Sequence, residues 1–76
     1  MPKITATSWK KFEKFVLYVG CTFERQKGDH IVYNRNDLLR PVVFPKDNSI
    51  PVFIIRNNQR VMGIYHHEYL NILEHL

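Results

Sequence analysis

The chain has 76 residues, of which 45% are hydrophobic, 13% aromatic and 24% charged, with only 3 Gly and 4 Pro. This length and composition predict a single folded domain over residues 1–76 and exclude a separate cofactor-binding domain. Eleven Lys and Arg against seven Asp and Glu give a formal net charge of +4, which suits an anionic partner, nucleic acid first and an acidic protein surface second.

Cysteine usage and hydropathy exclude further classes. Cys21 is the single cysteine, so an intramolecular disulfide and the usual paired-cysteine zinc site are both ruled out. The amino terminus, residues 1–5, leads into a basic stretch and does not resemble a signal peptide. The apolar stretches at 15–19 and 50–55 fall well short of the ~20 residues that span a membrane. We therefore expect a cytoplasmic protein with no membrane partner.

The first predicted element is a helix over residues 8–19, which Thr7 or Ser8 caps and Gly20 ends. Its apolar stripe contains Trp9, Phe12, Phe15, Val16, Leu17 and Val19. The opposite side gathers Lys10, Lys11, Lys14 and Tyr18. Such a lysine face either keeps the helix soluble or contacts an anionic partner.

Three strand-length runs follow, at residues 22–27, 30–34 and 40–44. Gly28-Asp29 and residues 35–37 separate them with turn signals, which predicts an antiparallel meander. Pro41 favours an edge strand or a strand start, since it cannot donate to the ladder. Helices can cover one face of such a sheet, and the other face, or the rim beside the first helix, is left to bind. The weak alternation along the strands does not show which face is open.

Residues 51–62 have strand character but also a helical opening at Pro51, and we predict a helix. Arg56 and Arg60 then lie on its polar side, whereas Asn58 falls inside the apolar stripe as a defect. A final helix begins near His66, with an apolar face of Tyr69, Ile72, Leu73 and Leu76. The predicted order is α-β-β-β-α with a short extra C-terminal helix, an α+β fold.

Most catalytic arrangements are missing from the sequence. No Gly-rich phosphate loop of standard spacing is present, and the acidic residues form no recognisable two-metal set. His66, His67 and His75 do not predict a metal site, because adjacent histidines point to different sides of a helix. We therefore expect neither a metal nor a small-molecule cofactor.

The hairpin at residues 25–33, Arg-Gln-Lys-Gly-Asp-His-Ile-Val-Tyr, is the best candidate for chemistry. His30 is a natural proton carrier near neutral pH, and Arg25 and Lys27 can hold a phosphodiester. RNA supplies its own nucleophile, the 2′-hydroxyl, so a nuclease of this kind needs a base, an acid and charge stabilisation but no metal. Against this, a histidine at a strand start is usually an ordinary polar surface residue.

Residues along nearly the whole chain resemble the HicA toxin family, small ribonucleases of bacterial and archaeal toxin–antitoxin systems. The family pattern is a helix ending in Gly-Phe, an Arg-Gln-x-Gly-Ser-His hairpin, a Val-Val-Pro strand and a closing Leu-Gly-Ile-Ser before an acidic-aromatic helix. The corresponding stretches here are Gly20 to Phe23, Arg25 to His30, Val42 to Pro45, Met62 to Ile64 and Glu68 to Leu70.

The resemblance implies a double-stranded-RNA-binding-domain-like fold and mRNA interferase activity, with the catalytic histidine at His30. It also implies a HicB-like antitoxin as the protein partner. Asp29 stands where the family usually has serine, and Tyr65 replaces a helix-capping serine. The loop at residues 46–50 is shorter than usual for the family.

The leading interpretation is a metal-independent endoribonuclease that cleaves mRNA with His30 as general acid or base. Tyr33 either stacks a base or packs in the core. The remaining residues predicted to bind RNA are Arg25, Gln26, Lys27, Gly28 and Lys14, supported by Lys10, Lys11 and Arg40. The alternatives are a non-catalytic RNA-binding module of the same fold and a domain whose basic face binds an acidic protein.

Overall fold

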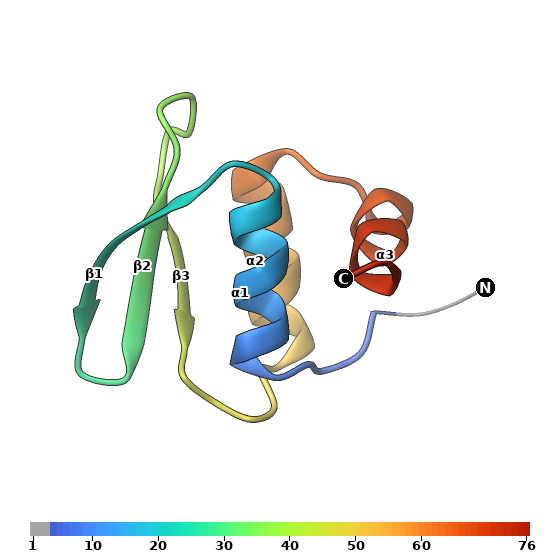
Figure 1. Cartoon of the computed structure of the whole chain (residues 1–76), viewed down its shortest axis with the longest axis horizontal. Helices are drawn as coiled ribbons and strands as arrows, with labels where there is room; N and C mark the ends of the chain where they lie inside the picture. Colours follow the sequence, from blue (N-terminus) through green and yellow to red (C-terminus); the bar gives the residue numbers. More distant parts are fainter. Residues whose placement is uncertain (1–3) are drawn as a thin grey trace.

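The elements follow the predicted order from one end of the chain to the other (Figure 1). The computed structural model describes residues 4–76, so the part of the signal-peptide expectation that concerns residues 1–3 lies outside the described residues. The elements are α1 (Trp9–Tyr18), β1 (Thr22–Lys27), β2 (His30–Asn34), β3 (Val42–Pro45), α2 (Val52–Met62) and α3 (His66–Glu74). The α-β-β-β-α prediction with an extra C-terminal helix is confirmed, and the architecture is consistent with a double-stranded-RNA-binding-domain-like fold.

Helix α1 begins at Trp9, directly after Ser8, one of its two predicted caps. The hydroxyl oxygen of Ser8 accepts a hydrogen bond from the Lys11 N–H at 3.3 Å, which satisfies one of the free donors of the first turn. Phe12, Phe15 and Val16 are fully buried. Leu17 was wrongly placed in the apolar stripe: it is 48% exposed, because the buried arc of α1 is narrower than the sequence pattern suggests.

The three strands form an antiparallel sheet in the order β1-β2-β3. Gly28, with a φ of 61°, allows the tight turn between β1 and β2, since a left-handed backbone there would strain other residues. In the register of the sheet, Lys27 pairs with His30 and Arg25 pairs with Val32. On the other side of β2, His30 pairs with Pro45 and Val32 pairs with Val43.

One face of the sheet is buried against α1. The ring of Phe12 meets that of Phe44 edge-on at 4.9 Å between centroids, and the Tyr33 ring stacks on Phe44 at 5.4 Å. Ile31 and Val42 complete this buried face. Side chains alternate along a strand and cross-strand partners share a face, so His30, Lys27 and Arg25 belong to the opposite face. That face, which we call the open face, is not covered by a helix within residues 4–76.

Helix α2 lies beside β3, at the edge of the sheet (Figure 1). The Asn58 carboxamide donates to the Val43 carbonyl oxygen at 2.9 Å and accepts from the Val43 N–H at 3.3 Å. The interpretation of Asn58 as a defect in the apolar stripe was therefore wrong, because its polar atoms replace the hydrogen bonds of a missing strand neighbour. No helix within residues 4–76 is long and apolar enough to cross a membrane.

Helix α3 packs on α1, on the side away from the sheet (Figure 1). The ring of Tyr69 meets Phe15 edge-on at 4.7 Å.

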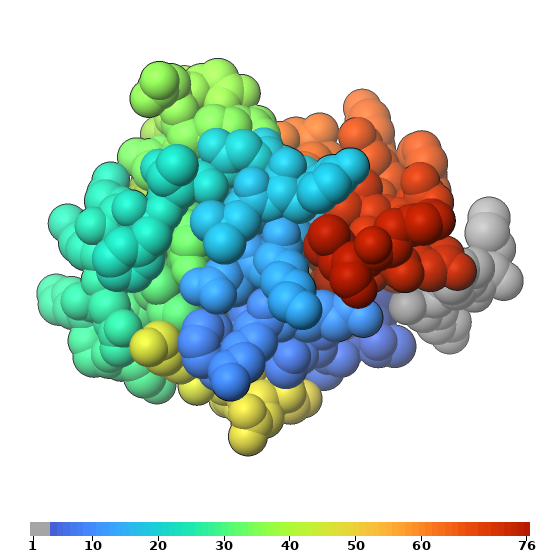
Figure 2. Space-filling model, viewed as in Figure 1, coloured from blue at the N-terminus to red at the C-terminus, as the bar shows by residue number. Residues whose placement is uncertain are grey.

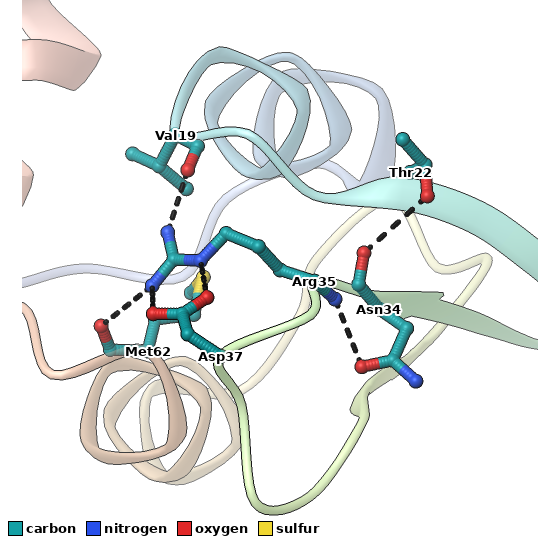
Figure 3. Close-up of polar contacts among 6 residues, drawn as sticks. All are labelled: Val19, Thr22, Asn34, Arg35, Asp37 and Met62. Atoms are coloured by element: carbon teal, nitrogen blue, oxygen red, sulfur yellow. Dashed lines mark hydrogen bonds and ion pairs between the residues drawn. The ribbon is translucent and has the colours of Figure 1, made fainter.

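Arg35, in the β2–β3 connection, makes hydrogen bonds to the carboxyl ends of two helices (Figure 3). Its guanidinium donates to the Val19 carbonyl oxygen at 2.6 Å, to the Met62 carbonyl oxygen at 3.5 Å and to both carboxylate oxygens of Asp37. One side chain thus links the carboxyl ends of α1 and α2.

Candidate active site

His30 opens strand β2 on the open face, where its side chain is 56% exposed. A groove runs between this face and α2, and we call it the His30 groove. It is lined by His30, Val43, Pro45, Phe53, Ile54, Asn57 and Arg60. The hairpin turn and the position of α2 beside β3 therefore place a histidine at the wall of a groove open to a large ligand.

The Asp29 carboxylate orients the imidazole of His30. The Asp29 Oδ1 atom lies 3.0 Å from His30 Nδ1, and both side chains are largely exposed. A carboxylate at this nitrogen favours the tautomer with the proton on Nδ1. The other ring nitrogen, Nε2, is then left to accept a proton from a ligand or, when protonated, to donate one.

Cations from two strands share the face of His30. Lys27 is its cross-strand neighbour, and Arg25 is two residues further along β1. Arg25 Nε lies 3.9 Å from the Glu24 carboxylate, a loose and exposed pair that leaves the guanidinium accessible. Positive charge next to His30 suits a phosphodiester, and this part of the predicted site is brought together by the sheet.

Arg60, from α2, adds a cation on the opposite wall of the His30 groove. Sequence reasoning placed Arg56 and Arg60 together on the polar side of this helix but did not connect either with His30. The i, i+4 spacing indicated a shared helix face. Only the packing of α2 along β3, through Asn58, shows that Arg60 reaches the groove.

Gln26 and Gly28 shape the hairpin. The Gln26 amide nitrogen donates to the Gly28 carbonyl oxygen at 2.8 Å, across the turn. Gln26 pairs with Ile31 in the ladder, so its side chain starts from the face opposite to His30. Both residues were predicted to bind RNA, and the contacts observed for them stabilise the turn that presents His30.

The placement of Tyr33 corrects the base-stacking hypothesis. Tyr33 is 1% exposed, and its hydroxyl donates to the carboxylate of Glu13 on α1. Burial first, and then this hydrogen bond, raise the pKa of the Tyr33 hydroxyl well above its ordinary value. A ring enclosed between α1 and the sheet has no free face for a base, so the core alternative is the correct one.

Lys10, Lys11 and Lys14, which the sequence predicts to bind RNA, lie on α1 and are not among the residues that line the His30 groove. Lys10, Lys11 and Lys14 are exposed on α1, which packs on the buried face of the sheet. Figure 2 views the molecule from the side of α1. Arg40 precedes β3, at the end of the strand far from the pairing of Pro45 with His30.

Other reactive groups do not contribute to the groove. Cys21 is buried, and this burial raises the pKa of its thiol, which opposes formation of the nucleophilic thiolate. Within residues 4–76, no three His, Cys, Asp or Glu side chains come together as a metal-binding group. The chemistry available in the groove is therefore proton transfer at His30 beside cations from β1 and α2.

The chain also matches a protein-family model. The family model described as the HicA toxin of bacterial toxin–antitoxin systems matches residues 9–64, which run from the start of α1 past the end of α2 and include His30. Comparison with curated proteins and with solved structures returned no match.

Proposed function

Because the chain belongs to the HicA family of toxins of bacterial toxin–antitoxin systems, we propose that it is a metal-independent endoribonuclease that cleaves mRNA. The observation that carries this proposal is the half-exposed His30 in an open groove, with Lys27 and Arg25 on its own face and Arg60 on the facing helix. A proton carrier among cations is what cleavage of RNA by its own 2′-hydroxyl requires.

In the proposed reaction, the 2′-hydroxyl oxygen attacks the adjacent phosphorus atom. The bond from O2′ to phosphorus forms, the bond from phosphorus to O5′ breaks, and the products are a 2′,3′-cyclic phosphate and a free 5′-hydroxyl. One proton leaves O2′ and one arrives at O5′. His30 Nε2 accepts the first proton or supplies the second, while Asp29 holds Nδ1.

Arg25, Lys27 and Arg60 have a separate role in this proposal. They bind the phosphate and stabilise the negative charge that builds on its oxygens as the pentacoordinate transition state forms. The positive charge of Arg60 in the groove, and of Lys27 and Arg25 on the face beside it, also suits a partner with an acidic surface. We propose that the cognate antitoxin is HicB-like and covers this groove, and that toxin and antitoxin act in the cytoplasm, where mRNA is found.

The test is cleavage of a long transcript by the purified protein in EDTA. We expect the wild type to cleave and His30→Ala to lose at least ~10²-fold in rate, the usual contribution of one proton-transfer group. RNA affinity should be unchanged, because the phosphate contacts remain. His75→Ala is the matched control, since it removes an exposed histidine at the end of α3. Retardation of RNA by the wild type without cleavage would instead establish a binding module.

A further inference from the structure

A second hollow lies at the junction of α2 and α3. It is lined by Arg56, Gln59, Arg60, Ile64, Tyr65, His66 and His67, and we call it the junction hollow. Arg60 also lines the His30 groove, so the two depressions meet at one side chain. None of the functions assigned above uses the junction hollow.

The charge of the junction hollow suits an anion. Arg56 and Arg60 are one turn apart on the exposed side of α2, and no acidic residue lines the hollow. The amino-terminal end of α3 lies at the same place, with Tyr65 at its cap position, and no side chain of residues 4–76 caps the free N–H groups. A helix start with uncapped N–H groups binds phosphate oxygens. Glu68 in the first turn is the opposing charge, and it lies outside the lining.

Gln59 is an independent indication of a ligand. It is the buried residue of the lining, 2% exposed, and within residues 4–76 neither its carboxamide oxygen nor its nitrogen has a hydrogen-bond partner. An unpaired buried amide destabilises the fold. A free donor and acceptor beside a cationic hollow match the polar edge of a bound ligand, which would supply the missing partners.

An aromatic surface borders the same cations. Tyr65 is 75% exposed, and its ring lies nearly parallel to that of His67, at 6.3 Å between centroids and 4° between planes. An exposed flat ring next to arginines is the arrangement by which proteins bind single-stranded nucleic acid: cations track the phosphates, and bases stack on the ring. An acidic protein segment would use the arginines but would gain nothing from the ring.

We propose that the junction hollow binds a phosphate and an adjoining base of the RNA strand whose scissile phosphate lies at His30, with Arg60 contacting the strand between the two sites. This inference rests on the proposed ribonuclease function. The ligand class is single-stranded RNA long enough to cross α2, so the hollow contributes to the binding of long substrates and not to the chemical step.

The binding test uses a labelled single-stranded RNA oligonucleotide and proteins that carry His30→Ala, so that the RNA stays intact. Tyr65→Ser should weaken binding at least about 5-fold, because one stacked base contributes about 1–3 kcal/mol, whereas Tyr65→Phe should bind like the parent. Arg56→Gln should also weaken binding. Lys14→Gln is the charge-matched control at an exposed position of α1, outside the junction hollow, and it should have the smaller effect. These side chains are exposed, and circular dichroism should show an unchanged fold.

A second measurement separates this inference from the proposed function. In the active protein, which keeps His30, Tyr65→Ser should raise KM for a long RNA. It should leave cleavage of a dinucleotide unchanged, because a dinucleotide cannot span both sites. If the wild type cleaves neither substrate, the ribonuclease proposal fails. The binding experiment still shows whether the junction hollow binds RNA. Parent-like oligonucleotide binding by both Tyr65→Ser and Arg56→Gln overturns the inference. The inference is also overturned if these two variants bind RNA like the parent and lose only the binding of an acidic protein.

Discussion

Asn58 pairs through both polar atoms of its carboxamide with the backbone of Val43, at 2.9 Å and 3.3 Å. Val43 lies in the edge strand β3, whose outer N–H and C=O groups have no strand neighbour in the described part of the chain. An unpaired edge is a template for association with other chains, and a side-chain amide is one way to close it. The same pair holds α2 at the distance that forms the His30 groove.

Asn58→Leu tests this relationship. The substitution keeps the volume but leaves the Val43 N–H and C=O groups without partners in a part-buried place. We expect the free energy of unfolding to fall by about 2 kcal/mol, since each lost bond to a buried group costs about 1 kcal/mol or more. Urea denaturation followed by circular dichroism measures it. A variant as stable as the wild type would show that the edge does not depend on this amide.

Arg35→Lys should destabilise the protein although it keeps the charge. A lysine ammonium cannot replace the forked guanidinium that reaches the Val19 and Met62 carbonyl oxygens and the Asp37 carboxylate together. We expect a loss of about 2 kcal/mol, the scale of hydrogen bonds made by a charged group. Thermal denaturation should show a lower Tm. Arg40→Lys, at an exposed arginine in the same connection, is the matched control and should leave Tm unchanged.

Tyr69→Phe should stabilise the protein. The Tyr69 hydroxyl is buried and has no hydrogen-bond partner among the residues that the structure describes, so removing it relieves a cost of about 1 kcal/mol. Burial also raises the pKa of Tyr69 from 10.0 to about 12. The pKa of Tyr69 is higher in the folded than in the unfolded state. The contribution of its neutral hydroxyl to the free energy of unfolding is therefore fully present below pH 10 and declines as the pH rises towards 12.

The measurement for Tyr69 is the free energy of unfolding at neutral and at alkaline pH. The advantage of Tyr69→Phe over the wild type should grow above pH 10, where only the wild type loses the contribution of this hydroxyl. An advantage that stays constant with pH would contradict the pKa assignment. A less stable Phe variant would contradict the claim that the hydroxyl is unpaired.

Asp29→Asn tests the carboxylate next to His30. Both side chains are exposed, so the variant should be as stable as the wild type within about 0.5 kcal/mol. Removing a negative charge beside the proposed phosphate site should tighten RNA binding about 2- to 5-fold at low salt, with a smaller gain at high salt. Fluorescence anisotropy at two salt concentrations measures this. Weaker binding would mean that Asp29 contributes to RNA contact instead of opposing it.

Local patterns were enough to predict the elements and the position of His30 at the start of a strand. Ser8 and Gly20 bound α1, Gly28 turns the hairpin, and the hairpin places His30 at a strand start; each depends on neighbours within a few residues. Gly63, with a φ of 69°, ends α2 in the same way. The family resemblance depends on these same short stretches, and it is confirmed over residues 9–64.

Only the tertiary structure shows which side chains of these elements lie on the same surface. The choice of sheet face buries Tyr33 and leaves His30 open. A strand of five residues offers too short an alternation to predict that choice. Arg60 reaches the groove only because Asn58 meets Val43, a contact between residues 15 apart in the chain. The sequence determined that the chain carries a basic hairpin with a histidine, and long-range packing determined which cations accompany it.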